Sequence, residues 1–319
     1  MNLSANSDPM LQKVYNIQCM DRDLIVYSVK KAYGSGKVMY YQIHEGVYVV
    51  HSDYYIKQIK HLEGVRFKAD VISMYSMYDG TNVSKINDDK SVIVKSGDMV
   101  NFAGNSAFYE SDGYGNHIVS IGVFGYSQSV SEMFACFFGC DHLVRDYDAF
   151  MKVHGSFLIC RNDLQYALIF NELLEAVRCK NRVLMKLKAL ELMVHEMTHY
   201  KLHVLEKHKI YDHYYIEKIY EIKAFMDENW SKKTNIEDLA KTYKINKTYL
   251  KEIFKACFGI SPHQYVINLR LEKSKTLLMN KSLKIEEIAS MTGFSSAGRY
   301  SESFKKNFGY LPSKFRQQN

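Results

Sequence analysis

The stretch Ile285–Arg316, IEEIASMTGFSSAGRYSESFKKNFGYLPSKFR, has the pattern of two helices joined by a tight turn. We expect a short helix from Ile285 to Met291 and a longer one from about Ser296 to Phe308, ended by Gly309. On the longer helix the aromatic residues recur every four positions and share one face, which leaves the opposite face polar. A helix anchored on one side and polar on the other has the shape that enters a DNA major groove. A solvated surface helix is the commoner structure with such a pattern. The choice between a surface helix and a DNA-binding helix therefore depends on features elsewhere in the chain.

An internal repeat supports the DNA-binding interpretation. Residues 237–240, EDLA, correspond to 286–289, EEIA, and residues 254–259, FKACFG, correspond to 304–309, FKKNFG. Between the two copies, Ser261–Pro262 predicts the start of a further helix. A linker helix of about 16 residues spans about 24 Å. This length can hold two recognition helices at a separation close to the distance between successive major grooves, which is about 34 Å. We therefore expect two helix-turn-helix motifs, at about 236–258 and 285–308, joined by a helix over 262–279.

The basic residues of the chain are concentrated in its C-terminal third. Residues 214–319 carry 19 Lys and Arg against 11 Asp and Glu, whereas residues 1–213 carry 23 against 24. The net charges of the two parts are therefore +8 and −1. A local positive charge raises the affinity for phosphate polyanions through counterion release. We therefore expect double-stranded DNA as the partner of the C-terminal third.

The composition is that of a folded protein without an export signal or a membrane span. The chain has 319 residues, 47% hydrophobic and only 3 prolines, enough for two domains with their own cores. No apolar run approaches the about 20 residues of a membrane span, and the N-terminal segment lacks the pattern of a signal peptide. We expect a cytoplasmic protein with no membrane contact, reduced cysteines and no cofactor. Cys136 and Cys140 lie in an apolar run and are interpreted as buried packing thiols.

The first two-thirds of the chain changes from a strand pattern to a helix pattern. Residues 1–128 hold short apolar or alternating runs separated by turns, as in a β-barrel or sandwich, and residues 129–209 are helical in periodicity. We therefore expect an α+β protein, with an N-terminal β-barrel or cupin-like effector and dimerisation domain over 1–209 and an all-α domain over 214–316. Tyrosines are dense in the β-rich part. Packing on the sheet faces is favoured for them, and a barrel interior that binds a flat aromatic ligand is the alternative.

The second long helix of this N-terminal part has an apolar seam at heptad spacing. Such a seam can pack against the β-rich part or against the same helix of a second copy, which would make a homodimer. The seam consists of Val183, Leu187, Leu190, Val194 and Met197.

The same helix contains His195–Glu196–Met197–Thr198–His199, which matches the H-E-x-x-H pattern of zinc hydrolases, and His203 follows one turn later. In that pattern two histidines bind zinc and the glutamate activates a water molecule. The glycine and spaced third ligand of the longer zincin patterns do not follow. At about 100° per residue the histidines fall opposite the seam, where a solvated face is expected. We therefore predict neither a metal site nor an enzyme, and keep a zinc hydrolase as a remote alternative.

The C-terminal third resembles the AraC/XylS family of transcription regulators over residues 216–316. The resemblance implies a seven-helix domain with two helix-turn-helix motifs that reads promoter DNA, and it implies activation by contact with RNA polymerase. The matching residues of the second motif are Ile288–Ala289, Gly293–Phe294, Phe304–Lys305–Lys306, Phe308–Gly309, Pro312–Ser313 and Phe315–Arg316. Those of the upstream part are Leu239–Ala240, Tyr249–Leu250, Ile253–Phe254–Lys255, Gly259–Ile260–Ser261–Pro262, Tyr265 and Arg270–Leu271.

By position, the resemblance places base-reading candidates on both longer helices. They are Thr248, Lys251 and Glu252 on the first, and Ser296, Arg299 and Glu302 on the second. Phosphate contacts position a protein without reading sequence, and the candidates for them are Lys247, Lys255, Lys305 and Lys306. Ala297–Gly298 departs from the polar residues usual in the family. We therefore expect Arg299 to take over base reading as a bidentate guanine contact.

The segment Leu184–Met197 resembles, over a short length, the regulators that sense ferric siderophores. This resemblance implies a β-barrel effector domain and a role at iron or siderophore genes. We therefore expect a sequence-specific activator whose effector, a ferric siderophore, changes how paired DNA-binding domains engage DNA. The alternative is a regulator controlled by a protein partner, which a barrel interior filled by large side chains would favour.

Overall fold

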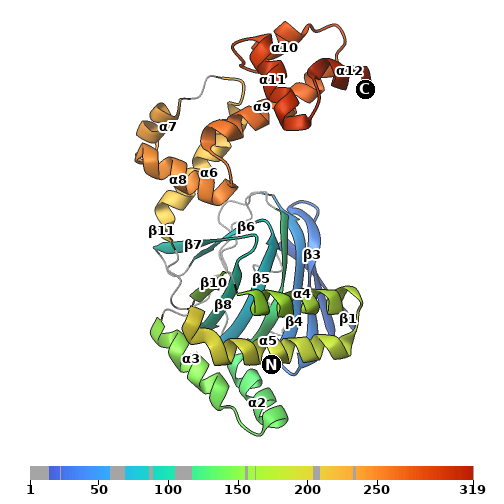
Figure 1. Ribbon diagram of the computed structural model, residues 1–319, viewed down its shortest axis with the longest axis vertical. Helices are drawn as coiled ribbons and strands as arrows, with labels where there is room; N and C mark the ends of the chain where they lie inside the picture. The colour runs from blue at the N-terminus through green and yellow to red at the C-terminus, as the bar shows by residue number, and fades with distance from the viewer. Residues whose placement is uncertain are drawn as a thin grey trace. The chain divides into compact units, whose positions relative to one another are not determined.

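The chain separates into two compact units, which we call the N-terminal unit, Met1–His213, and the C-terminal unit, Tyr214–Asn319 (Figure 1). The structure is a computed structural model. In the part of the chain that the structure describes, no helix combines the length and the apolar composition that crossing a membrane requires. The described residues are 14–21, 23–57, 69–85, 89–104, 117–154, 157–161, 163–203, 209–232 and 235–318.

The N-terminal unit is built on two antiparallel sheets. The larger sheet has eight strands in the spatial order β1 (Tyr15–Asp21), β2 (Leu24–Val29), β3 (Gly34–His44), β4 (Val47–Ile56), β9 (His117–Tyr126), β5 (Val71–Asp79), β8 (Met99–Gly104) and β10 (Phe157–Cys160). The smaller sheet has the order β11 (Ile210–Asp212), β7 (Lys90–Lys95) and β6 (Thr81–Lys85). The larger sheet begins at β1 and ends at β10 without pairing them. The closed barrel that the strand pattern predicts is therefore not found among the described residues.

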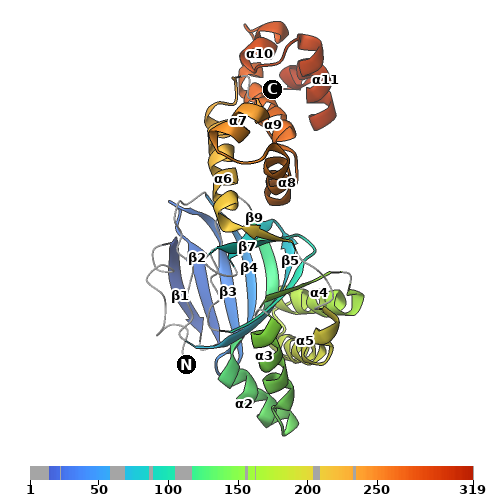
Figure 2. The same cartoon turned by 90° about the vertical axis from the view of Figure 1, so that its left-hand side faces the viewer.

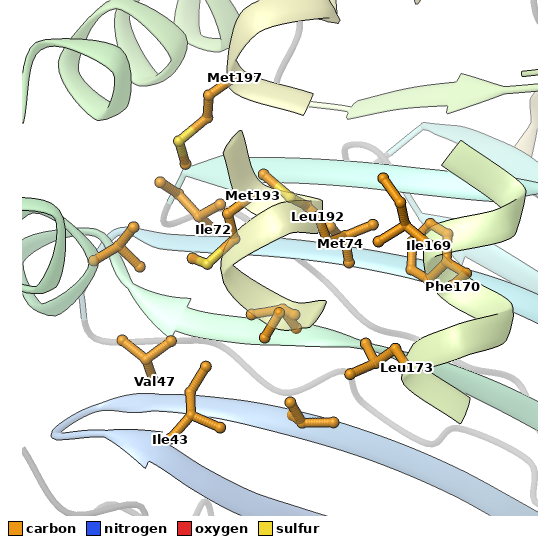
Figure 3. Close-up of a cluster of buried hydrophobic side chains, with 14 of the residues drawn as sticks. Ile43, Val47, Ile72, Met74, Ile169, Phe170, Leu173, Leu192, Met193 and Met197 are labelled. Carbon is orange, nitrogen blue, oxygen red and sulfur yellow. The ribbon is translucent and has the colours of Figure 1, made fainter. Parts of the chain in front are cut away.

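Four helices, two before and two after β10 in the chain, pack on one face of the larger sheet. They are α2 (Ser127–Phe138), α3 (His142–His154), α4 (Leu164–Arg178) and α5 (Arg182–His203). Figures 1 and 2 show α4 and α5 side by side across this face. Apolar side chains of the sheet, such as Ile72 and Met74, lie there beside Met193 and Leu192 of α5, and Phe170 of α4 belongs to the same buried cluster (Figure 3). Burial of this face by helices explains why the strands need not close on themselves to exclude water.

The opposite face of the larger sheet is aromatic. The ring of Tyr40 packs edge-on against Tyr27, Tyr48 and Phe124, with ring centroids 5.4, 6.1 and 6.4 Å away. Phe124 in turn contacts Tyr126 at 5.8 Å. Burial, reinforced by the neighbouring hydroxyls of Tyr126 and Tyr48, raises the pKa of Tyr27 to about 12. The tyrosines of the β-rich part therefore pack on a sheet face, the use that the sequence favours.

Helix α5 does not bury the whole heptad seam against the sheet, which was the first of the two uses that the sequence allows. Its buried residues are Met185, Ala189, Leu192, Met193, His195, Glu196, Met197 and Tyr200. Of the seam, only Met197 is fully buried, whereas Val183 and Leu187 are 68% and 55% exposed. Leu190 and Val194 pack at the edge of the core. Nearly every side of this helix carries apolar residues, so periodicity alone does not select the buried one.

The C-terminal unit is entirely helical in its described residues. Its helices are α6 (His213–Glu228), α7 (Ile236–Thr242), α8 (Lys247–Phe258), α9 (Pro262–Leu278), α10 (Ile285–Met291), α11 (Ala297–Phe308) and α12 (Pro312–Gln318). Helix α9 runs through the unit as the linker. Its Leu271 and Leu278 pack with Tyr300 and Phe304 of α11, and its Ser274 hydroxyl accepts a hydrogen bond from Tyr300 at 3.0 Å.

Candidate nucleic-acid interface

The C-terminal unit holds two helix-turn-helix motifs, α7–α8 and α10–α11, with matching local structure. In both motifs the first helix has 7 residues and the second has 12. The turns contain a residue in the left-handed region, Lys244 with φ 52° in the first motif and Gly293 with φ 75° in the second. Each longer helix ends at a left-handed glycine, Gly259 or Gly309. The repeat seen in the sequence is therefore also a repeat of backbone geometry.

The first longer helix, α8, is fixed by a buried apolar side. Leu250, Ile253, Phe254 and Cys257 are buried, and burial raises the pKa of the Cys257 thiol to about 12. The side chain of Asn246 caps the helix by accepting hydrogen bonds from the backbone N–H groups of Thr248 and Tyr249. This cap holds the first turn, where two of the candidate residues, Lys247 and Thr248, lie.

The opposite side of α8 carries the candidate contact residues. Thr248, Lys251 and Lys255 are exposed, as is Lys247 at the start of the helix. Glu252 is only half-exposed, so it is less open to a ligand than the sequence pattern predicts. The ammonium of Lys247 pairs with Glu237 of α7, and this hydrogen bond holds the pKa of Glu237 below its ordinary value.

A basic hollow lies beside the start of α8. It has a volume of about 530 Å³ and is lined by Glu237, Ala240, Lys241, Lys244, Ile245, Asn246 and Lys247. Three of these seven side chains are lysines, so the hollow is suited to a phosphate. Sequence reasoning did not select Lys241 and Lys244, although three lysines around one predicted turn was a signal that could have identified them.

The second longer helix, α11, has the same division into a buried and an exposed side. Tyr300 and Phe304 are fully buried, while Arg299, Glu302, Lys305 and Lys306 are exposed. The hydroxyl of Ser296 caps the helix by accepting from the backbone N–H of Arg299 at 3.3 Å. The side chains of Arg299, Lys305 and Lys306 make no hydrogen bond or ion pair with the described residues. They are therefore available to a ligand outside the chain.

The H-E-x-x-H segment of α5 does not form a comparable site. His195 and Glu196 are buried and His199 is exposed, so the expectation of a solvated face is wrong for His195. The ring of His195 lies between those of Tyr166 and His199, and its Nε2 is 3.5 Å from Asp163. Among the described residues, no group of three or more His, Cys, Asp and Glu side chains is placed to hold a metal ion. The side chain of His203 lies outside the described residues.

The thiols near the end of α2 also differ from expectation. Cys136 and Cys140 are both exposed, together with Phe137 and Phe138 between them. The expectation that they are buried packing thiols is wrong, because α2 buries the other side of its last turns through Met133 and Phe134. An apolar run near a helix end does not by itself show which of its residues reach the core.

Comparison with known proteins identifies a domain within the C-terminal unit. Residues 239–318 match a protein family described as a helix-turn-helix domain. Over 98 residues the chain is 33% identical to the Msm operon regulatory protein of Streptococcus mutans, covering 31% of this chain and 35% of that protein. It is 32% identical over 95 residues to the virulence regulon transcriptional activator VirF of Yersinia enterocolitica, covering 30% and 35%.

A solved structure also resembles this part of the chain. It is the C-terminal domain of AraT, a response regulator from Geobacillus stearothermophilus, at 26% identity and a TM-score of 0.31, covering 32% of this chain and 85% of that one. The chain thus spans about a third of the length of the curated relatives it matches. The resemblance of the C-terminal third to AraC-type regulators is confirmed at the level of its helix-turn-helix domain.

Proposed function

We propose that this protein is a sequence-specific DNA-binding transcription regulator rather than an enzyme. The observation that carries the proposal is the pair of matching motifs, each presenting one helix with a buried apolar side and an exposed basic side. The confined positive charge of residues 214–319 supports a phosphate polyanion as the ligand. A promoter-bound regulator of this kind would activate transcription through RNA polymerase, and its place of action would be the cytoplasm.

Within this proposal, the exposed side chains have two roles. Arg299, Thr248 and Lys251 read base edges, with Ser296, Glu252 and Glu302 beside them. Lys247, Lys255, Lys305 and Lys306 contact phosphates and set the register.

The test is selection of DNA by the full-length protein from a pool of randomised duplexes. We expect enrichment of a sequence with two halves whose centres lie about 10 base pairs apart, one helical turn. A pool that remains random after several rounds at physiological salt would contradict the proposal. Affinity for the selected duplex is then compared with affinity for a shuffled one, with a ratio of about 10³ or more expected for specific binding.

We further propose that the N-terminal unit makes DNA binding depend on a signal. Its aromatic sheet face, centred on Tyr40, Tyr48 and Phe124, offers rings for stacking a flat aromatic effector such as a ferric siderophore. The same face is filled by large side chains packed edge to face, and this observation favours the second candidate, control by a protein partner. The first candidate requires a small molecule to bind the N-terminal unit, and the second requires another protein to bind it.

The affinity for the selected duplex distinguishes these signals. It is measured with and without a panel of ferric siderophores and other flat aromatic compounds. A change of about tenfold, which corresponds to a coupling free energy of about 1.4 kcal/mol, supports a small-molecule effector. An affinity that stays constant across the panel removes the siderophore hypothesis and leaves the partner-controlled regulator.

We also propose that the protein is a homodimer formed through the exposed apolar residues of α4 and α5. Leu164 and Leu168 of α4, and Val183, Leu184 and Leu187 of α5, are the exposed members of this surface. Leu187→Asp is expected to convert a dimer to a monomer in sedimentation velocity, because it places a charge in the apolar contact. Lys186→Asp, at the adjacent exposed position, is the matched control and should leave the dimer intact. A wild-type protein that sediments as a monomer at micromolar concentration would contradict the proposal.

A further inference from the structure

The side chain of Arg270, on the linker helix α9, lies between the segment that precedes the first helix-turn-helix motif and the turn of the second motif. Its Nε donates a hydrogen bond to the carbonyl oxygen of Trp230 at 2.8 Å. Its two terminal nitrogens donate to the carbonyl oxygens of Gly293 and Lys232, both at 2.9 Å. Trp230 and Lys232 belong to the segment that leads into the first motif, whereas Gly293 is in the turn of the second. One guanidinium therefore holds backbone from both sides of the unit.

The backbones joined by Arg270 are in direct contact. A Cβ atom built on Gly293 would lie 2.7 Å from the carbonyl oxygen of Ser231 and 2.9 Å from the Cζ atom of Arg270. Real Cβ atoms do not approach other atoms so closely, so the turn of the second motif has no room for a side chain. The position of segment 230–232 against that turn is therefore closely defined.

The chemistry of arginine suits this contact in a way that lysine cannot reproduce. A guanidinium is planar and presents its N–H donors at fixed angles, whereas an ammonium presents a compact charge on a flexible stem. Three acceptors from three different residues therefore fix the plane of the Arg270 side chain. Burial lowers the pKa of the guanidinium from its ordinary value, yet arginine remains protonated because that value lies far above neutral pH.

We propose that Arg270 is a positioning residue that sets the separation of the two recognition helices, α8 and α11. The inference rests on the proposed function, because a separation matters only if both helices engage one DNA site. Arg270 would act through the backbone contacts described above and would not itself read DNA. A fixed separation of α8 and α11 would make binding depend strictly on the number of base pairs between the two halves of the DNA site.

The test uses the full-length protein, the selected duplex, and derivatives of that duplex with one or two base pairs inserted between its halves. Wild-type protein should bind the one-base-pair derivative at least about tenfold more weakly, because insertion rotates and shifts one half-site relative to the other. Arg270→Met should bind the original duplex about tenfold more weakly but lose less than about threefold on insertion. A loss of spacing preference, rather than a loss of affinity alone, is the readout.

Two further variants separate positioning from charge. Arg270→Lys keeps the charge but not the planar donor geometry, and it should behave as Arg270→Met does. Lys273→Met removes a charge from an exposed position of the same helix and should retain the wild-type preference for the original spacing. If Arg270 acted only by attracting DNA, Arg270→Lys would resemble the wild type and Lys273→Met would resemble Arg270→Met.

Folding of the variants is followed through Trp230, the only tryptophan of the chain. A cooperative thermal transition in its fluorescence, together with binding to a duplex that carries one half-site, shows that both motifs are folded. Arg270 variants that keep the wild-type spacing preference overturn the inference while leaving the proposed function intact. Failure of both variants to fold also overturns it, since Arg270 would then be needed for stability and not for separation. A wild-type protein that selects no DNA removes the proposed function and the inference together.

Discussion

The two helix-turn-helix motifs of the C-terminal unit share a backbone and differ in the exposed side chains at the start of their longer helices. Their helices have equal lengths, and the buried pair Leu250 and Phe254 of α8 corresponds to Tyr300 and Phe304 of α11. At the start of the longer helix, however, Lys247–Thr248 stands where the second motif has Ala297–Gly298. The residues that build the scaffold and those that would read DNA are therefore specified separately.

The turns of the two motifs show why the same backbone conformation needs glycine in only one place. Lys244 adopts the left-handed region where it lines the hollow beside α8, whereas Gly293 adopts it against Ser231 and Arg270. A side chain in the left-handed region costs about 1–2 kcal/mol, which a folded domain can tolerate. A side chain that also collides with neighbouring backbone cannot be accommodated. Glycine at this turn is thus required by packing in the second motif and not in the first.

The largest expected effect tests whether the two motifs are equivalent in their cores. Phe254→Ala and Phe304→Ala each remove a fully buried ring, and each should lower the free energy of unfolding by about 3–5 kcal/mol. Trp230 fluorescence during urea unfolding measures the change. Phe225→Ala, at a position 39% exposed, is the control and should cost less than about 1 kcal/mol. A small effect in only one of the two buried positions would break the equivalence.

A smaller effect separates the two turns. Gly293→Ala should destabilise the unit by about 2–3 kcal/mol, because the left-handed backbone strain is added to a backbone collision. Lys244→Ala keeps a side chain in the same conformation and should change the free energy of unfolding by less than about 0.5 kcal/mol. A cost at Gly293 no larger than the about 1–2 kcal/mol of left-handed strain alone would show that packing around Gly293 has no part in the difference.

Base-reading and phosphate-contacting side chains are distinguished by how the loss of affinity varies among DNA sequences, and not by the size of the loss. Arg299→Ala should cost about 1–3 kcal/mol on the selected duplex and relax the preference at one base pair. Lys305→Ala should weaken binding to all duplexes alike and reduce the slope of log affinity against log salt by about 1. Fluorescence anisotropy with duplexes varied one base pair at a time measures both. A uniform loss for Arg299→Ala would make it a phosphate contact and leave base reading to α8.

The smallest expected effect is a gain in stability. Lys244→Gly removes the strain of a left-handed lysine and should raise the free energy of unfolding by about 0.5–1 kcal/mol, after the extra freedom of glycine in the unfolded chain is counted. The thermal midpoint of the Trp230 transition should rise accordingly. A lower midpoint would mean that the Lys244 side chain makes a stabilising contact in the hollow.

The C-terminal unit could be predicted closely because its signals are local. Asn246 and Gly259 mark the ends of α8 through their own hydrogen bonding and backbone freedom, and the repeat supplies the same information twice. The chain also contains aromatic residues at regular spacing, which identify the buried side of α11. In the C-terminal unit, contacts between distant segments therefore do not change the helices that the local sequence signals predict.

The N-terminal unit could be predicted only in outline, because its arrangement depends on contacts between distant segments. Helix α5 has apolar residues on most sides, so Leu187 and Leu192 look alike in sequence although one is exposed and the other is buried. Glu196 lies in the core beside Tyr147 and Tyr166, whose pKa values are raised by burial and, second, by its carboxyl. Whether a set of strands closes into a barrel also depends on which helices or loops cover each face of the sheet. The alternation of apolar and polar residues along a strand does not contain this information.

The three hydrogen bonds of Arg270 have a consequence for how this domain can evolve. Their acceptors are main-chain carbonyl oxygens, which every amino acid supplies. Mutation of Trp230 or Lys232 therefore changes a side chain without removing the acceptor. Only Arg270 and Gly293 must keep their side-chain identity for the three hydrogen bonds to form, whereas Trp230 and Lys232 can be replaced without loss of the acceptors. Descendants of this sequence could diversify the surface around the junction and still inherit its geometry.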